Sequence, residues 1–299
     1  MPSFLNSGDQ IEIVAPARFI DKSDLFYAKE IIKRNGFRVK INDRLYKRQN
    51  IFAGSNENRI LGLESALNDS QTKAIFFARG GYGCIQLIDS INFKIFLEKP
   101  KWLIGFSDAT TILIHIYVKH KVSSIHGPMP YNFKNTKQKS IDMIFDLLRG
   151  DKEKIKISNN NLNVYGSCSG VLIGGNLSIL CSMIGSSSFL LLKKQYILFI
   201  EDIDEYRYQI ERMMYILDRA GVLKNLKGLI VGQMTNILDN EISFGKTTHQ
   251  IIRDIVSKYN YPIAFDFPIG HSNTNHPLVI GAKIHLDVNT EFSEISYEK

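Results

Sequence analysis

Segments typical of buried strands alternate with helical segments through the first 120 residues, and this alternation constrains the fold more than any other feature. Short apolar runs predict strands at residues 11–15, 37–41, 74–78 and 101–104. Helical patterns with polar caps occupy residues 23–35, 57–68, 84–91 and 108–119. A strand–helix–strand order places successive strands parallel, with helices on both faces of the sheet. The predicted fold is therefore α/β, with an N-terminal, mainly parallel sheet flanked by helices.

The alternation loosens between residues 150 and 166, where the polar run Asn159-Asn-Asn-Leu-Asn163 has no periodic pattern. We expect an N-terminal α/β domain over residues 1–150, a linker over 151–165 and a second, smaller α/β domain over 166–299. In the second domain we predict helices at 177–185, 206–220 and 247–259, and strands at 196–200, 228–232 and 263–265. The alternating tail, residues 283–297, is predicted to form strands of a smaller sheet.

Composition and charge exclude several classes of protein. Hydrophobic residues make up 44% of the chain and charged residues 22%, which is ordinary globular usage and excludes a disordered or fibrous protein. The formal net charge is +7, but Lys and Arg are scattered, so nucleic-acid binding is not expected. No apolar run reaches the roughly 18 residues of a membrane span, and the first ten residues do not resemble a signal peptide. We therefore expect a cytoplasmic protein that does not bind membranes.

Cofactor motifs are missing from the sequence. The three cysteines, Cys84, Cys168 and Cys181, lie far apart and contain no C-x-x-C pair, which argues against a disulfide framework. There is no H-E-x-x-H zinc motif and no G-x-x-x-x-G-K-[ST] phosphate loop. The run Gly80-Gly-Tyr-Gly83 fails the dinucleotide fingerprint, because Gln86 stands where the third glycine belongs. We expect no metal and no other cofactor.

The sharpest local feature is Gly105-Phe-Ser-Asp-Ala109, which lies between a predicted strand and a predicted helix. A serine on such a turn is exposed at the sheet edge, and small residues two positions before and after it let the turn close. Ser107 is therefore a candidate nucleophile, although Gly-x-Ser-Asp is also a good helix cap. The chain offers one rival: Gly166-Ser-Cys-Ser-Gly170 has the same spacing around Cys168. Because an apolar strand follows Cys168 instead of a helix, this rival is disfavoured.

A nucleophilic serine needs a base and a group that orients the base. Among the seven histidines, His271 lies in a polar segment directly after a predicted strand, where binding residues of α/β proteins concentrate. His126 is the second candidate and His276 the third. For each histidine the alternative is a hydrogen-bonded structural group.

The acid that orients the base is expected in Glu201-Asp-Ile-Asp-Glu205. Glu201 closes an apolar strand and is aimed at the sheet edge, although a strand-end surface charge is the alternative. Asp204 or Glu205 is expected to cap the following helix, since anions are favoured at helix N-termini. Acyl transfer also needs donors for the oxyanion, and the N–H groups of Gly81 and Asp108 are the ones most consistent with Ser107.

These motifs together resemble the serine LD-carboxypeptidases, the muramoyltetrapeptide carboxypeptidase family that includes the microcin-C immunity peptidases. The resemblance runs almost end to end, and each motif is weak alone. The matching motifs are Gly8-Asp-Gln-Ile-Glu-Ile-Val-Ala-Pro16, Arg79-Gly-Gly-Tyr-Gly83, Gly105-Phe-Ser-Asp108, His126-Gly-Pro-Met129, Gly174-Gly-Asn-Leu177, Glu201-Asp-Ile-Asp-Glu205 with Tyr208 and Arg212, and Gly270-His271.

The resemblance implies a nucleophile at Ser107, a charge-relay acid at Glu201 and a base at His271, with oxyanion donors at Gly81 and Asp108. It implies two α/β domains, with the serine on the first and the other two residues on the second, and a homodimer. It also implies that the substrate is a murein tetrapeptide, or a related peptide that ends in a D-amino acid, and that the enzyme works in cell-wall recycling. Family members commonly carry Arg where Gln86 stands, so the local charge near the substrate differs here.

Three other functions are considered. The first is the immunity-type peptidase that cleaves acyl-sulfamoyl adenylate peptides, for which the sequence assigns no clear adenine platform. The second is a non-catalytic binding module on the same scaffold, which the joint presence of Ser107, Glu201 and His271 disfavours. The third is a lipase-like hydrolase, which Ala109 and the distribution of the three residues over two domains disfavour.

Overall fold

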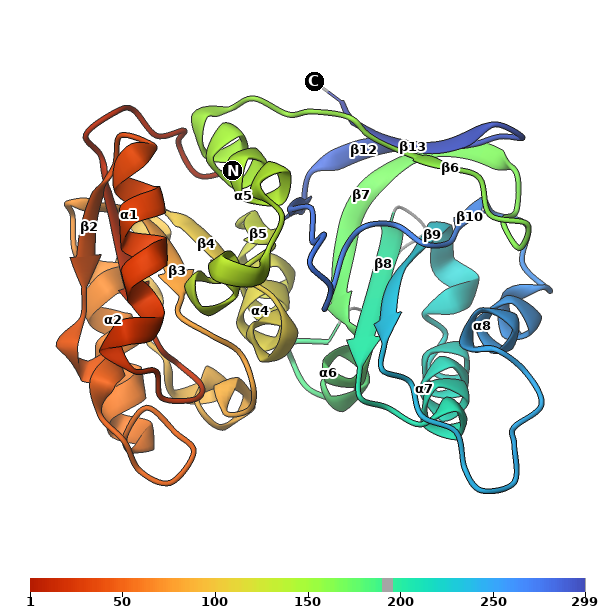
Figure 1. Ribbon diagram of the computed structural model, residues 1–299, viewed down its shortest axis with the longest axis horizontal. Helices are drawn as coiled ribbons and strands as arrows, with labels where there is room; N and C mark the ends of the chain where they lie inside the picture. The colour runs from red at the N-terminus through yellow and green to blue at the C-terminus, as the bar shows by residue number, and fades with distance from the viewer. Residues whose placement is uncertain (190–195, 299) are drawn as a thin grey trace. The chain divides into compact units, whose positions relative to one another are not determined.

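The computed structural model describes residues 1–189 and 196–298, which form two compact units. The first unit comprises residues 1–151 and 273–279, and the second comprises residues 152–272 and 280–299. The predicted α/β fold class is confirmed: each unit contains one sheet with helices packed on it (Figure 1).

The sheet of the first unit has six strands in the order β11-β5-β4-β3-β1-β2, and the pairs among β1 to β5 are all parallel. The strands are β1 (Gln10–Val14), β2 (Arg38–Ile41), β3 (Thr72–Phe77), β4 (Trp102–Gly105), β5 (Ser124–His126) and β11 (Leu278–Ile280). The helices are α1 (Phe26–Arg34), α2 (Asn56–Asn68), α3 (Lys94–Glu98), α4 (Thr110–His120) and α5 (Gln138–Arg149). The central strands β3 and β4 are almost wholly buried, because α2 and α4 cover them.

The second unit has a seven-stranded sheet in the order β10-β9-β8-β7-β12-β13-β6. Its strands are β6 (Ile155–Ser158), β7 (Gly166–Asn176), β8 (Tyr196–Ile203), β9 (Leu226–Thr235), β10 (Ile263–Ala264), β12 (Lys283–Val288) and β13 (Phe292–Tyr297). The helices are α6 (Leu177–Ser182), α7 (Arg207–Arg219) and α8 (Thr248–Val256). Strands β7 to β10 run parallel, whereas β12, β13 and β6 add antiparallel strands beyond β7.

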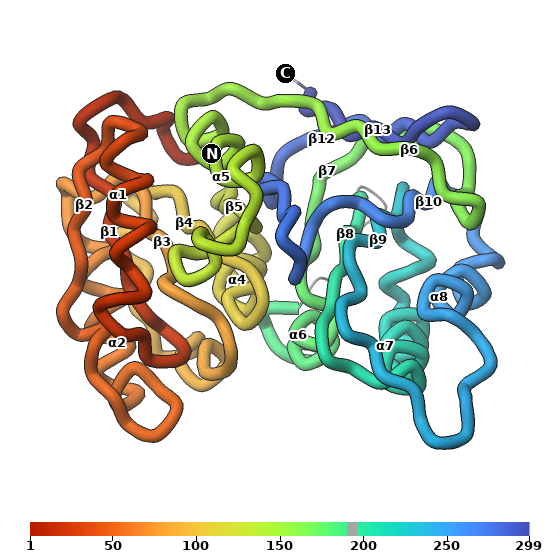
Figure 2. Tube along the Cα trace, in the orientation of Figure 1, coloured from red at the N-terminus to blue at the C-terminus, as the bar shows by residue number. Residues whose placement is uncertain are grey.

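Local sequence signals explain several helix boundaries. The Ser55 side chain accepts a hydrogen bond from Asn58 N and begins α2, and Thr247 accepts one from Gln250 N and begins α8. Helix α5, which we did not predict, ends at Gly150 in the left-handed conformation (φ +104°) that glycine adopts most easily. The N-terminal segment runs beside α5, where Leu5 N donates to Leu148 O (Figures 1 and 2).

Three predicted elements differ in the structure. The helix expected over residues 84–91 is two 3₁₀ turns, Cys84–Gln86 and Ile88–Ser90, and Cys84 N at the start of the first turn donates to the Asp108 carboxylate. The alternating tail does not form a separate small sheet, since β12 pairs with β7 and extends the main sheet of its unit. Helix α7 is not capped by Asp204 or Glu205: Tyr206 occupies the N-cap position, and its N–H donates to the Gln209 side chain.

The predicted domain boundaries also differ from the two units. Residues 155–158 of the expected linker form β6, which pairs with β13. Residues 273–279, expected in the second domain, belong to the first unit. There Asn273 O accepts a hydrogen bond from Lys137 N, and His276 Nδ1 lies 2.9 Å from Ser140 Oγ of α5. These bonds between residues far apart in sequence leave no local signal.

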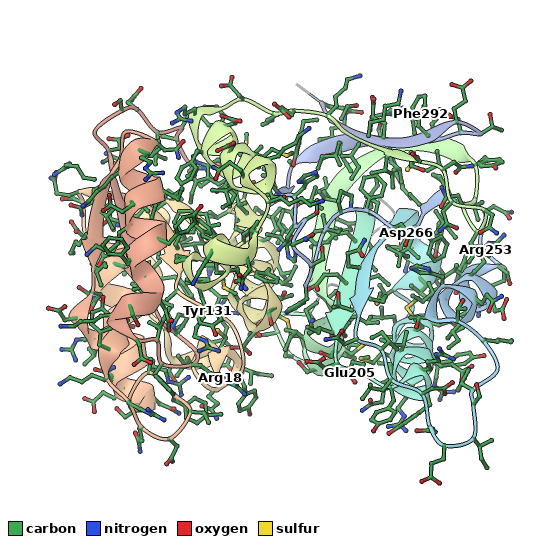
Figure 3. The ribbon with its side chains drawn as sticks, viewed as in Figure 1. Arg18, Tyr131, Glu205, Arg253, Asp266 and Phe292 are labelled. Atoms are coloured by element: carbon green, nitrogen blue, oxygen red, sulfur yellow. The ribbon has the colours of Figure 1, made fainter. Side chains whose placement is uncertain are left out.

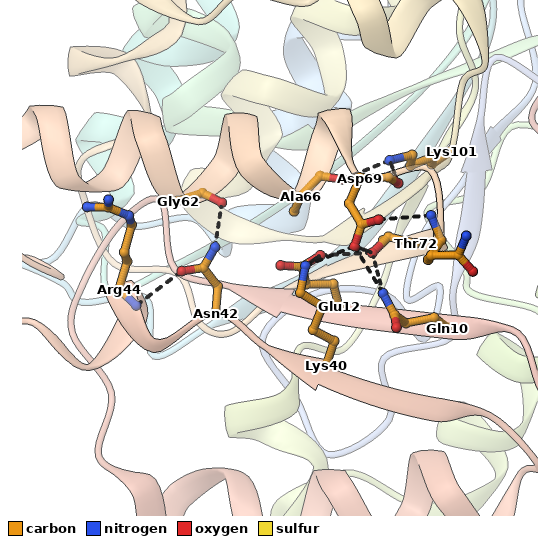
Figure 4. A network of polar contacts seen from close by, with 11 residues as sticks. Gln10, Glu12, Lys40, Asn42, Arg44, Gly62, Ala66, Asp69, Thr72 and Lys101 are labelled. Carbon is orange, nitrogen blue, oxygen red and sulfur yellow. Dashed lines mark hydrogen bonds and ion pairs between the residues drawn. The ribbon is translucent and has the colours of Figure 1, made fainter.

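A polar network lies at the start of β3, on the first unit (Figure 4). Lys40 Nζ lies 2.9 Å from Asp69 Oδ2 and 3.2 Å from Oε2 of the buried Glu12, and the Thr72 hydroxyl donates to Glu12 at 2.8 Å. Burial raises the pKa of Asp69, but hydrogen bonds from Lys40 and Gln71 N outweigh it and lower the pKa to about 2.

We expect Asp69→Asn to lower the free energy of unfolding at pH 7 by about 1–2 kcal/mol, because a native pKa below the unfolded value stabilises the fold at all pH values above the unfolded pKa. This contribution is lost as the pH falls from about 4 towards the native value of about 2. Urea unfolding of the wild type and the variant at pH 7, 5, 4 and 3 measures the difference in their free energies of unfolding. This difference should shrink below pH 4. Asp151→Asn, at an exposed carboxylate, is the control. A constant difference down to pH 3 would contradict the prediction.

Candidate active site

Ser107 lies on a strained turn at the carboxyl end of β4. Its φ is +61°, a left-handed conformation that costs a non-glycine residue about 1–2 kcal/mol. The flanking residues must be small: a Cβ on Gly105 would lie 2.9 Å from both Ala109 Cβ and Phe77 Cδ2. The turn continues as a 3₁₀ turn, Ser107–Ala109, into α4. This geometry is that of a nucleophile turn, with Ala109 in place of the usual glycine.

The glycine loop after β3 packs against this serine. A Cβ on Gly80 would lie 3.0 Å from Ser107 Cβ and 3.1 Å from Ser107 Oγ, so any larger residue would crowd the serine. Gly81 follows with φ +114°. The first N–H groups of a helical turn have no partner inside it, which leaves the Asp108 N–H at the start of the Ser107–Ala109 turn available to a ligand.

The Asp108 side chain joins the two loops. It is 1% exposed, and its Oδ2 accepts a hydrogen bond from Cys84 N at 2.9 Å. Burial raises the pKa of Asp108, although the bonds from Cys84 oppose this shift. Arg59, also buried, donates to Gly83 O at 3.2 Å and to the Gln86 side chain at 2.8 Å. Gln86, which departs from the family pattern, is therefore a partner of this buried arginine.

In the second unit, Glu201 and His271 form a hydrogen-bonded pair. His271 Nδ1 lies 2.7 Å from Oε2 of Glu201, whose side chain is fully buried in β8. Gly270 permits this contact, because a Cβ there would lie 2.8 Å from Glu201 Oε2. The His271 backbone is held through its carbonyl, which accepts from Thr235 Oγ1 at 2.9 Å. The pair has the arrangement of a base and its orienting acid.

The acids around His271 control its charge. Burial of the ring lowers the pKa of His271, but the charge and hydrogen bond of Glu201 raise it more, and the net pKa lies above the ordinary value of 6.5. Asp202 and Asp204 add to this effect. The pair therefore stabilises an imidazolium, the form that a general base adopts after taking a proton.

Asp202 is a residue whose position the sequence did not predict. Burial, together with the charge of Glu201, raises its pKa to about 7. Its carboxylate accepts hydrogen bonds from Asn176 Nδ2 at 2.8 Å and from Ser178 N at 2.9 Å, and so it caps α6 rather than α7. The sequence feature that could have indicated this position is the motif Gly174-Gly-Asn-Leu177, because its Asn176 also caps α6. A Cβ on Gly174 would lie 1.9 Å from Phe199 O, which explains that glycine.

The other sequence candidates occupy structural positions. His126 is buried at the end of β5, and its ring packs edge-on against Phe106 at 5.9 Å. His276 is bonded to Ser140 of α5. Cys168 lies within β7 as predicted, and burial raises the pKa of its thiol to about 11, which disfavours a thiolate nucleophile. Across residues 1–189 and 196–298, no cluster of three or more His, Cys, Asp or Glu side chains could hold a metal ion, and no helix is long and apolar enough to cross a membrane.

Comparison with known protein families matches both units. Residues 11–127 match the LD-carboxypeptidase N-terminal domain, and residues 169–286 match the LD-carboxypeptidase C-terminal domain. The chain belongs to the LD-carboxypeptidase family. It is therefore a serine-type carboxypeptidase, as the motifs predicted.

Relatives of this LD-carboxypeptidase span its whole length. The probable murein peptide carboxypeptidase of Bacillus subtilis is 29% identical over 296 residues, covering 96% of this chain and 91% of the relative. The crystal structure of muramoyltetrapeptide carboxypeptidase from Oxalobacter formigenes has a TM-score of 0.88 at 26% identity and covers 97% of this chain and 99% of its own. The microcin C7 self-immunity protein, solved in complex with aspartyl sulfamoyl adenosine, has a TM-score of 0.86 at 19% identity. The match covers 100% of this chain and 98% of that protein's chain, which shows a shared fold.

We predict that Glu201→Gln lowers the pKa of His271, because burial remains while the negative charge that opposes it most is removed. NMR titration of histidine-labelled protein measures this shift. His115 on α4, whose pKa burial lowers to about 4, provides the internal control and should not shift. An unchanged His271 pKa in the variant would mean that Glu201 does not set the charge of the ring.

The strained turn gives a second prediction. Ser107→Gly should be more stable to unfolding than Ser107→Ala by about 1 kcal/mol, because only glycine adopts a positive φ without steric cost. The matched pair Ser65→Gly and Ser65→Ala, within α2, should show the opposite order. Thermal or urea unfolding of the four variants tests both. Equal unfolding stability of Ser107→Gly and Ser107→Ala would contradict the strained conformation of residue 107.

Proposed function

We propose that this LD-carboxypeptidase removes the terminal D-alanine from murein tetrapeptides by acyl-enzyme chemistry of Ser107, His271 and Glu201. The observation that carries the proposal is the buried Glu201–His271 pair, with its 2.7 Å hydrogen bond and raised histidine pKa, in a chain whose other unit bears a serine on a strained turn. A relative named for murein peptides and a structure named for the muramoyltetrapeptide support the substrate class.

In the proposed mechanism, Ser107 Oγ attacks the carbonyl carbon of the bond that precedes D-alanine. His271 takes the serine proton through Nε2 and delivers it to the leaving amine, and then activates the water that hydrolyses the ester. Glu201 accepts a hydrogen bond from Nδ1–H and stabilises the imidazolium. The N–H groups of Gly81 and Asp108 donate to the oxyanion of the tetrahedral intermediate. The two units must bring Ser107 and His271 within hydrogen-bond distance when substrate is bound.

The proposal includes the cellular setting. We infer a cytoplasmic homodimer that acts in cell-wall recycling and requires no metal or other cofactor, as the family resemblance implies. Light scattering of the purified protein tests the dimer, and fractionation of the source cells tests the location. Activity that falls in EDTA and returns with zinc would exclude the cofactor-free mechanism.

We expect Ser107→Ala, His271→Ala and Glu201→Ala each to reduce kcat for D-alanine release by at least about 100-fold, because each removes one member of a single catalytic unit. The Ser107/His271 double variant should be little worse than either single variant. The measurement is mass spectrometry of the products from a defined tetrapeptide, L-Ala-γ-D-Glu-meso-diaminopimelate-D-Ala, beside its all-L isomer, which should be spared.

Two matched variants are the controls: Cys168→Ala and His126→Ala should keep most of the wild-type activity, since their side chains are placed in β7 and β5. Near wild-type turnover in Ser107→Ala, or a collapse in Cys168→Ala alone, would show that the nucleophile is misassigned. Turnover of an aspartyl sulfamoyl adenylate with no turnover of tetrapeptide would favour the immunity-type activity. Binding of the tetrapeptide without any turnover would favour the non-catalytic module.

A further inference from the structure

Arg18 lies beside the serine turn within the first unit. It follows β1 and Pro16, and its stem packs directly on Gly81: a Cβ there would lie 2.5 Å from Arg18 Cδ and 2.7 Å from Arg18 Nε. The preceding glycine, Gly80, makes the corresponding close contact with Ser107. Arg18 and Ser107 therefore pack against adjacent residues of the same glycine loop.

Among the residues that the structure describes, no acidic side chain pairs with Arg18. Within residues 1–189 and 196–298, its guanidinium makes no hydrogen bond and no ion pair, and its Nε is shielded from solvent without a partner. The acid of the neighbouring turn, Asp108, is buried and bonded to Cys84 N. A half-buried arginine normally finds an acceptor, because its five donors lose water on burial. The geometry suits an anionic ligand.

Arg79 adds a second positive charge at the same place. Its Nη1 donates to Phe19 O, the residue next to Arg18, at 3.4 Å. Its guanidinium lies over the ring of the exposed Tyr131, 4.3 Å from the ring centroid. Tyr131 and Arg18 are both labelled on the first unit in Figure 3. No carboxylate pairs with Arg79 anywhere in the described part of the chain. Because the backbone carbonyl and the ring hold Arg79 in place, Arg18 has the greater freedom to meet a ligand.

We propose that Arg18, assisted by the charge of Arg79, binds the free α-carboxylate of the residue that the enzyme removes. This inference rests on the proposed function at Ser107. In a carboxypeptidase substrate, that carboxylate lies three bonds beyond the scissile carbonyl carbon, within about one residue length (~3.8 Å between Cα atoms) of the attacked atom. Arg18 packs on Gly81 and Ser107 packs on Gly80, so the two side chains meet adjacent residues of one loop. A planar guanidinium binds a carboxylate through two parallel hydrogen bonds.

The proposal explains why the enzyme trims chain ends. A peptide that continues beyond the scissile bond has an amide in place of the carboxylate, and so leaves the arginine charge uncompensated. Removing one partner of a hydrogen-bonded charge pair weakens binding by about 30-fold or more. The wild-type enzyme should therefore prefer the tetrapeptide acid to its C-terminal carboxamide by at least about 30-fold in kcat/KM.

Arg18→Gln tests the assignment. We expect KM for the acid to rise at least about 10-fold with kcat changed less than 3-fold, since binding of a remote group contributes to the ground state and the transition state alike. Turnover of the carboxamide should not change, so the preference for the acid falls towards 1. Arg18→Lys should show an intermediate preference. Arg34→Gln, at an exposed arginine in the last turn of α1, removes the same charge and should change the turnover of neither substrate.

A binding measurement separates this inference from the proposed function. Calorimetry with Ser107→Ala and with Ser107→Ala/Arg18→Gln measures the affinities for the acid and the carboxamide without turnover. If wild type cleaves neither peptide but the double variant loses its preference for the acid, the proposed reaction is wrong and the role of Arg18 stands. An acid preference that survives Arg18→Gln in both turnover and binding overturns the inference. The unfolding temperature of Arg18→Gln should match wild type, because the guanidinium makes no bond within the described protein.

Discussion

The buried Asp108 carboxylate is the constraint on which the first unit's chemistry depends. It links the serine turn to the glycine loop by accepting a hydrogen bond from Cys84 N, while Arg59 holds the neighbouring Gly83 carbonyl. A buried charge that loses its partners costs several kcal/mol, so the two loops cannot separate independently. This linkage allows Ser107 to keep a left-handed backbone that its own conformational preference opposes.

The second unit uses a pair of adjacent carboxylates for two purposes. Successive side chains of a strand point to opposite faces. Glu201 is bonded to His271, whereas Asp202 is bonded to Asn176 and Ser178 N at the start of α6. One strand end therefore supplies both the charge that keeps His271 basic and the cap that fixes the adjoining helix.

Charge is distributed unequally around the proposed catalytic residues. Three acids surround His271 and raise its pKa. The arginines beside Ser107, by contrast, have no acidic partner among the described residues, and the carboxylate of a departing residue would supply one. Within its own unit, the proposed base lies among acids, and the proposed nucleophile lies beside cations.

The sequence by itself determined the alternation of strands and helices and the serine turn with its small flanking residues, because these follow from local burial, capping and steric fit. Only the tertiary structure decided which distant groups meet. Residues 84–91 appeared helical but form two short turns, and the N–H of Cys84 is bonded to the Asp108 carboxylate of another loop. Residues 273–279 join the first unit through bonds to Lys137 and Ser140. A local pattern records that a group must be buried or bonded, whereas its partner is a residue 24 positions away in the case of Cys84 and 136 positions away in the case of His276.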